Sequence, residues 1–244
     1  MKLNNKVIVI MGASSGMGAA ISRRLATDGA NLVIAARRLD YLEKIQAEFP
    51  DGQILVKQAD VTNYDEVKAV VDLAIEKFGH IDVIDNNAGI MPQSPLIAGK
   101  RDEWQRTIDT NITGVLNGIA AALPEMVNQG YGHIIATDSV AGHTVFPNGA
   151  VYAGTKYAVR AIMGGLRKEQ AKNNIKTTII SPGATDTPIY QTKNPEKDKQ
   201  SYEYMRQLGT LHPEQIADAV EFAIATDPNM AINEILVRPT KQAE

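Results

Sequence analysis

Seven short apolar runs, rich in valine and isoleucine, alternate along the chain with longer segments of helical periodicity. The runs are residues 7–11, 32–36, 54–56, 81–84, 133–136, 177–180 and 234–237. They show little polar alternation, which is typical of strands buried on both faces. Because parallel strands need crossover connections, this order predicts a doubly wound α/β fold with helices on both faces of a parallel sheet. No shift in composition divides the chain, so we expect one domain over residues 1–244.

The helical segments between these runs are residues 16–27, 39–49, 65–78, about 104–119, 152–172 and 213–225. Thr62 and Asp65 stand in capping-box spacing at the start of the third segment, and Gly79 follows its end. Residues 183–212 are polar and long for a loop in a compact fold. We expect them to form a substrate-binding lid, and a solvated surface loop is the alternative.

Composition excludes several classes of protein. The net charge of −3 provides no basic surface for nucleic acid or an anionic membrane. The chain has no cysteine, which rules out disulfides and thiolate metal sites and fits a cytoplasmic protein. No apolar stretch approaches the roughly 20 residues of a membrane span, and the N-terminal apolar run is too short for a signal peptide. We expect no metal, nucleic-acid or membrane partner.

A glycine-rich turn follows the first predicted strand. It contains Gly12, Gly16 and Gly18, with Ser14, Ser15 and Met17 between them. Glycines let the backbone approach a pyrophosphate, and the next helix offers its N-terminal N–H groups. The turn also matches G-x-S-x-G, the nucleophile elbow of hydrolases, with His133, His143 or His212 as the formal base. That fold needs several strands before the elbow, so we favour a dinucleotide site.

Two arginines, Arg37 and Arg38, follow the second predicted strand. A dinucleotide site that binds NAD has an acidic residue here for the ribose 2′-hydroxyl, whereas guanidinium groups bind a 2′-phosphate. The pair therefore favours NADP(H). The alternative is that both arginines are only the solvated start of a helix.

Polar residues follow the third and fourth predicted strands as well. Asp60 and Val61 come after the third, and Asn86-Asn87-Ala88-Gly89 after the fourth. Open α/β sheets bind ligands at these carboxyl ends, although asparagine and glycine also serve simple turns. Asn111 interrupts a helical pattern. Either a kink that holds a water or plain surface exposure explains it.

Tyr152 and Lys156 are four residues apart and share one helix face, and Ser139 lies thirteen positions upstream. A tyrosine is a suitable acid for carbonyl reduction when its pKa, near 10 in free form, is brought towards neutrality. A shift of about three pH units requires roughly 4 kcal/mol. An ammonium group about 4 Å away supplies that much at an effective dielectric constant near 20. The alternative is a tyrosine on a helix face without chemistry.

In joint order and spacing, these motifs resemble the short-chain dehydrogenase/reductase family. The motifs are Gly12-x3-Gly16-x-Gly18, Asp60, Asn86-Asn-Ala-Gly89, Asn111, Ser139, Tyr152-x3-Lys156 and Pro182-Gly183. The resemblance covers about residue 5 to the C-terminus and implies a Rossmann-type fold with a seven-stranded parallel sheet. Ala36-Arg37-Arg38, residues 139–142 and residues 234–240 look like the NADP-preferring reductases of small ketones and 3-hydroxy acids. Met11, Asp85 and Asp138 depart from the family pattern.

The resemblance also implies roles for these residues. Tyr152 is the general acid/base, Ser139 orients the substrate oxygen, Lys156 bonds the nicotinamide ribose, and Asn111 holds a water in a proton relay. Asp60 and Val61 face the adenine, and Asn87, Ala88 and Gly89 the adenosine ribose. Pro182, Gly183 and Thr187 face the carboxamide of the nicotinamide. The family also implies a homotetramer packed through the long fourth and fifth helices and the C-terminal strand region.

The expected activity is reversible hydride transfer between NADPH and a small or aryl ketone. Substrate walls are expected from Val145, Phe146 and Pro147 on one side and from Ile189, Tyr190, Tyr202 and Tyr204 on the other. Their apolar character disfavours large polyanionic substrates. A 3-hydroxy acid dehydrogenase of serine type and a catalytically silent sensor of NADP(H) are the alternatives.

Overall fold

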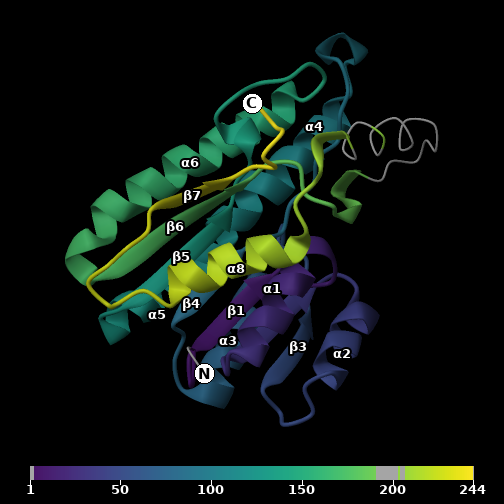
Figure 1. Ribbon diagram of the computed structural model, residues 1–244. Coiled ribbons are helices and arrows are strands. Elements are labelled where there is room, and N and C mark those ends of the chain that lie inside the picture. The colour runs from purple at the N-terminus through teal and green to yellow at the C-terminus, as the bar shows by residue number, and fades with distance from the viewer. Residues whose placement is uncertain (1–2, 191–202, 204–206, 244) are drawn as a thin grey trace.

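The computed structural model, which describes residues 3–190, 203 and 207–243, contains a seven-stranded parallel sheet of order β3-β2-β1-β4-β5-β6-β7 (Figure 1). The strands are β1 (Val7–Met11), β2 (Asn31–Ala36), β3 (Ile54–Gln58), β4 (Val83–Asn86), β5 (Gly132–Thr137), β6 (Ile175–Pro182) and β7 (Glu234–Val237). The predicted Rossmann-type α/β fold is confirmed. The order reverses direction between β1 and β4, where folds of this type bind ligands.

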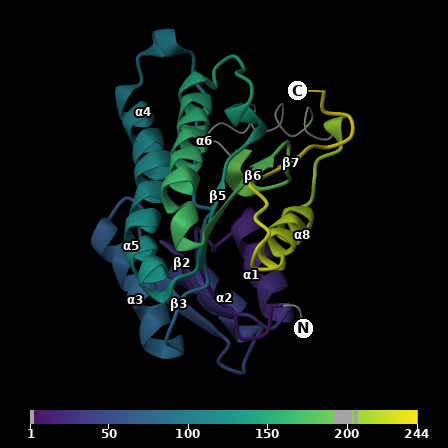
Figure 2. The same cartoon turned by 90° about the vertical axis from the view of Figure 1, so that its left-hand side faces the viewer.

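Helices cover both faces of the sheet (Figure 2). On one face lie α1 (Gly16–Thr27), α2 (Leu39–Ala47) and α8 (Pro213–Ile224). On the other lie α3 (Tyr64–Phe78), α5 (Gly114–Gln129) and α6 (Ala150–Gln170), with α4 (Arg101–Ile108) leading into α5. Each face has its own core of buried aliphatic side chains, so the central strands are apolar on both sides, as their sequence predicts. No described helix has the length and apolar character that crossing a bilayer requires.

Two local predictions were wrong. The fourth strand begins at Val83 instead of residue 81 and continues through Asp85 and Asn86. Asp82 precedes it as a polar anchor whose carboxylate accepts the Val7 N–H at 2.8 Å. Pairing therefore starts two residues later and extends into polar residues that an apolar pattern does not mark. Helix α3 is capped by Asn63 and not by Thr62, because the Asn63 side chain accepts the N–H groups of the first turn.

Asp85 lies at the centre of the sheet, paired with Ile10 on one side and Ile135 on the other. It is fully buried, and neither carboxylate oxygen has a hydrogen-bond partner in the described part of the chain. Burial alone raises the pKa of Asp85 to about 7. The folded protein thus holds this proton more tightly than the unfolded chain does, so stability falls as pH rises from about 4 to about 7.

We therefore predict that Asp85→Val, which replaces the carboxyl with an apolar side chain of similar size, stabilises the protein. The gain in free energy of unfolding should be about 1.5 kcal/mol at pH 5 and reach about 4 kcal/mol above pH 7. Urea unfolding at a fixed protein concentration measures it at pH 5 and pH 8. Asp82→Val is the matched control and should destabilise at both values, because it removes the partner of Val7 and Lys6. No gain for Asp85→Val at pH 8 contradicts the prediction.

Candidate active site

The turn from β1 into α1 packs against the end of β4 so closely that its glycines have no room for a side chain. A Cβ on Gly12, whose φ is +84°, would lie 2.7 Å from the Ala88 Cα. A Cβ on Gly18 would lie 2.3 Å from the Gly12 carbonyl oxygen and 2.5 Å from the Asn87 Nδ2. Asn87 Nδ2 also donates to that carbonyl at 3.1 Å. The turn therefore exposes backbone atoms, and not side chains, to a ligand at this position.

The N-terminus of α1 has the features of an anion site. Its N-cap residue, Ser15, makes no side-chain cap, and the first turn has no acidic residue. The first N–H groups and the positive end of the helix dipole are thus available to a ligand. Thr187 lies against Gly16, 3.2 Å from the position of a Cβ there. The Met17 side chain packs on the core, so only its backbone can serve a nucleotide.

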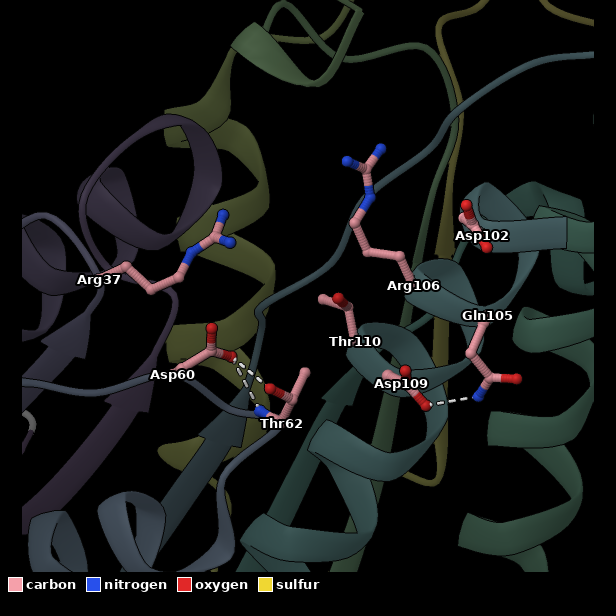
Figure 3. Close-up of a pocket in the computed structure, with 8 residues that line it drawn as sticks. All are labelled: Arg37, Asp60, Thr62, Asp102, Gln105, Arg106, Asp109 and Thr110. Carbon is pink, nitrogen blue, oxygen red and sulfur yellow. Dashed lines mark hydrogen bonds between the residues drawn. The ribbon is translucent and has the colours of Figure 1, made fainter. Parts of the chain in front are cut away.

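The two predicted arginines take different positions at the end of β2. Arg38 Nη2 donates to the Ser14 and Ser15 hydroxyls at 3.1 and 2.9 Å, and its guanidinium lies 4.4 Å from the centre of the Tyr41 ring. Arg37 points instead into a hollow of about 400 Å³ (Figure 3). Its guanidinium has no hydrogen-bond or ion-pair partner among the described residues. Arg37 is therefore available to bind a phosphate. Arg38 is bonded to the glycine turn and lies at its rim.

This hollow also contains the predicted Asp60, whose Oδ1 accepts the N–H and hydroxyl of Thr62 at 3.0 and 2.9 Å. Arg106 lies across the hollow from Arg37 (Figure 3). Sequence reasoning missed Arg106, because an exposed arginine on a helix carries no signal of its own. Val61 packs against Gly114, and its carbonyl accepts a bond from Asn117.

The Ser14 hydroxyl is bonded to Arg38, and the described bonds of the three candidate histidines lead elsewhere. His133 contacts Thr178, His143 contacts Arg160 and Ser181, and His212 caps α8. The hydrolase alternative therefore finds no nucleophile–base pair within the described residues.

Tyr152, Ser139 and Lys156 come together at the carboxyl end of β5. Tyr152 and Lys156 lie on α6 and are 5% and 4% exposed. Ser139 lies close enough to the Tyr152 hydroxyl to lower the pKa of this phenol. Ser139 Oγ also accepts the Ala141 N–H at 3.1 Å, which fixes the short 3₁₀ turn after β5. Lys156 Nζ donates to the Thr137 carbonyl at 2.7 Å.

The expected lowering of the tyrosine pKa does not occur in this structure. Burial raises the pKa of Tyr152, and the nearby Ser139 only partly opposes this effect. Burial also lowers the pKa of Lys156 to about 8. The ammonium group lies 5.7 Å from the centre of the phenol ring and points at Thr137, so its attraction is weaker than the cost of burying a phenolate. Tyr152 is therefore a neutral acid at physiological pH, the form that protonates an oxygen.

Asn111 lies in a π-helical turn (Asp109–Thr113) between α4 and α5 and is only 1% exposed. Its amide accepts the Ile90 N–H at 2.9 Å and donates to the Ile90 carbonyl at 3.0 Å and to Thr155 Oγ1 at 3.1 Å. The interpretation as a surface residue was wrong. A Cβ on Gly89 would lie 3.5 Å from Asn111 Oδ1 and 3.8 Å from Lys156 Nζ, so this glycine keeps a small space between the two polar atoms.

Part of the predicted substrate wall lies beside Tyr152. Phe146 packs with Met91 against the buried Ala141, Tyr152 and Ala153, and Met91 was not foreseen from sequence. Val145 and Pro147 are exposed. Tyr190 lies close enough to Tyr152 to raise its pKa, whereas the predicted lid residues Tyr202 and Tyr204 fall outside the described residues or side chains.

Pro182 ends β6 and Gly183 is held beside the C-terminal segment. The Gly183 N–H donates to the Val237 carbonyl at 2.7 Å, and a Cβ on Gly183 would lie 2.3 Å from Gln242 Oε1. The end of β6 thus lies at the same edge of the sheet as the glycine turn, to which Thr187 returns.

Comparison with known sequences agrees with this geometry. The profile of the short chain dehydrogenase family matches residues 6–198. The chain belongs to the short-chain dehydrogenase/reductase family, and it is an oxidoreductase.

Among relatives, an uncharacterized oxidoreductase of Staphylococcus saprophyticus is 49% identical over 99% of this chain and 98% of its own. One of Listeria monocytogenes is 47% identical over 99% of each chain. Among solved structures, an alcohol dehydrogenase of the archaeon Thermococcus sibiricus complexed with 5-hydroxy-NADP has a TM-score of 0.86, 30% identity and 98% coverage of both chains. The closed form of a serine dehydrogenase complexed with NADP⁺ has a TM-score of 0.90 and 28% identity, covering 98% of this chain and 96% of its own.

We predict that Gly18→Ala destabilises the protein by about 1–3 kcal/mol, because the new methyl group overlaps the Gly12 carbonyl and the Asn87 amide. Gly164→Ala, inside α6 with open space around its Cβ position, is the matched control and should stabilise by up to about 1 kcal/mol. Chemical unfolding of both variants measures the difference. Equal stability of the two variants would show that the turn can relax and that the close packing is not required.

Proposed function

We propose that the protein is an NADP-dependent oxidoreductase that reversibly reduces a small or aryl ketone to a secondary alcohol, with Tyr152 as general acid/base. The observation that carries the proposal is the buried Tyr152 hydroxyl, which lies close to Ser139 and one helical turn from the Lys156 ammonium. The similar structures complexed with NADP⁺ and 5-hydroxy-NADP support the choice of coenzyme.

The residues present fit this coenzyme. The backbone surface of Gly12, Gly16 and Gly18 and the uncapped start of α1 would hold the pyrophosphate. Arg37, with Arg38 beside it, would bind the 2′-phosphate, and Asp60 and Val61 would face the adenine. The expected course of the dinucleotide is also bordered by Ser14, Ser15, Asn87, Ala88 and Gly89. When bound, NADPH supplies a hydride for the substrate carbon.

The chain supplies the proton and the orientation. Tyr152, kept neutral by burial, donates its proton to the substrate oxygen, and Ser139 donates a hydrogen bond to the same oxygen. The Lys156 ammonium stabilises the phenolate that remains. The space that Gly89 keeps between Asn111 Oδ1 and Lys156 Nζ suits a water, through which protons would return from solvent.

The substrate walls favour an uncharged or aryl group. Met91 and Phe146 are apolar and pack directly beside Tyr152. Residues 183–212 would serve as the lid. The likeness to a serine dehydrogenase keeps a 3-hydroxy acid as the second candidate substrate. Parallel assays with NADPH and NADH against small ketones, aryl ketones and 3-hydroxy acids distinguish the two.

A catalytically silent sensor of NADP(H) is the remaining alternative from another class. The complete, buried set of Ser139, Tyr152 and Lys156 disfavours it, because a sensor does not require a proton donor. Oxidation of NADPH by any ketone of the panel would exclude this alternative, and binding of NADPH without turnover would support it.

We also propose a cytoplasmic homotetramer. Large apolar side chains are exposed on α5 (Leu116), α6 (Tyr157), α8 (Phe222) and β7 (Leu236), where subunits would pack. Sedimentation equilibrium measures the assembly directly.

Tyr152→Phe should reduce kcat for ketone reduction by about 10³-fold while thermal unfolding and NADPH binding remain unchanged, because only the proton donor is lost. Tyr64→Phe, at an exposed tyrosine that begins α3, is the control and should keep full activity. Substantial turnover by Tyr152→Phe would exclude it as the proton donor.

Arg37→Asp should shift the ratio of kcat/KM for NADPH over NADH towards NADH by about 10- to 100-fold, because a carboxylate repels the 2′-phosphate that the guanidinium binds. Arg101→Asp, at the exposed start of α4 and outside the hollow, is the charge-matched control. An unchanged ratio in Arg37→Asp would mean that the 2′-phosphate binds elsewhere.

A further inference from the structure

Behind the Tyr152 group lies a set of five interacting side chains, here named the Asp138 cluster. It consists of Asp138, His143, Arg160, Ser181 and Glu234. They come from the end of β5, the residue after the 3₁₀ turn, α6, β6 and β7. Sequence spacing gives no indication of the cluster, since its members are up to 96 residues apart.

Arg160 is the cation at the centre of the cluster. Its Nη1 lies 3.9 Å from Asp138 Oδ2 and donates to His143 Nε2 at 2.6 Å, and it also bonds Glu234. Ser181 Oγ donates to Asp138 Oδ2 at 3.2 Å. One oxygen each of Asp138 and Glu234 and one His143 nitrogen fall within 4.8 Å of one another, a spacing that suits a cation, and Arg160 provides it.

Asp138 connects this cluster to the catalytic serine and to the catalytic helix. It directly precedes Ser139, whose backbone N–H opposes the rise in the pKa of this carboxyl group. Gly142 lies against that carboxylate, since a Cβ there would be 2.3 Å from Oδ2. Arg160 is one turn beyond Lys156 on α6, so its ion pair with Asp138 holds this helix against the end of β5.

The same carboxylate acts electrostatically on the buried lysine. Burial lowers the pKa of Lys156, and Asp138 is the group that opposes this effect. Burial raises the pKa of Asp138 to about 6, with Lys156 and Arg160 opposing. Between pH 6 and 8, therefore, the carboxylate and the ammonium are both charged. The other titratable groups that face Asp138 are Tyr152 on α6, His143 after the 3₁₀ turn and Glu234 on β7.

We propose that Asp138 is a positioning residue of the active site: its carboxylate, 3.9 Å from Arg160 on α6, fixes the Ser139 segment against this helix and places a negative charge beside Lys156, whose Nζ donates to Thr137, the residue before Asp138, at 2.7 Å. This rests on the proposed catalytic role of Tyr152 and Lys156. With the Asp138 carboxylate in place, we expect the proton-transfer site to stay active to a higher pH than the same site without this negative charge.

The test compares Asp138→Asn with Glu234→Gln, which removes a second carboxylate from Arg160 but is not among the groups that act on Lys156. Protein labelled with ¹³C at the lysine Cε allows the Lys156 amine to be titrated by NMR, with Lys156→Ala assigning the signal. The pH profile of kcat/KM for ketone reduction is measured on the same variants.

In Asp138→Asn we expect the Lys156 titration and the alkaline limb of the profile to move to a pH about one unit lower. Removing the carboxylate also lowers the pKa of Tyr152, which moves the limb in the same direction. Glu234→Gln should leave both midpoints in place. Should Asp138→Asn fail to fold, Asp138→Ser provides the same loss of charge with a smaller side chain.

An unchanged Lys156 titration in the Asp138 variants overturns the proposal, as does an equal shift in Glu234→Gln. The NMR titration does not depend on turnover. If wild-type protein reduces no ketone while the Lys156 midpoint shifts as expected, the proposed function fails and the electrostatic role of Asp138 stands.

Discussion

The buried ammonium group of Lys156 is the feature around which this structure is arranged. A cation in a protein interior is costly unless hydrogen bonds and opposite charge offset its loss of hydration. Here the Lys156 ammonium donates a hydrogen bond to the Thr137 carbonyl at 2.7 Å, and the Asp138 carboxylate provides the nearby negative charge. Both residues belong to the end of β5. The end of β5 thus provides the hydrogen-bond acceptor, Thr137, and the negative charge, Asp138, for the lysine on the helix that carries Tyr152.

Helix α6, which carries Tyr152 and Lys156, is held from two sides. On one side, Arg160 ties α6 to Asp138 and Glu234. On the other, the Asn111 amide joins Ile90, after β4, to Thr155, whose hydroxyl donates to the Tyr152 carbonyl at 2.7 Å. The π-helical turn explains how Asn111 reaches this position, because an extra residue in the turn redirects its side chain into the interior. Tyr152 is therefore oriented by contacts that do not involve its hydroxyl.

Local sequence was sufficient for the strand–helix order, the glycine turn and the grouping of Ser139, Tyr152 and Lys156, because each depends on period, spacing or topology. It failed where the answer depends on distant contacts. The shift in the pKa of Tyr152 is set mainly by the burial of the phenol. Charge and spacing alone predict a lowered pKa, whereas burial raises it. Strand β4 was misplaced because Asp85 and Asn86 pair within it despite being polar. Arg106 and the Asp138 cluster have no recognisable sequence motif, because their surroundings are formed by residues that are distant in the sequence.

The proposed activity requires that a neutral phenol, held by a buried helix, faces the substrate oxygen beside the nicotinamide while arginine receives the phosphorylated ribose. A crystal structure of the protein grown with NADP⁺ tests this arrangement. We expect the Tyr152 hydroxyl to be directed at the nicotinamide ring and the 2′-phosphate to lie against Arg37. A phenol directed away from the ring, or a 2′-phosphate remote from the end of β2, would contradict it.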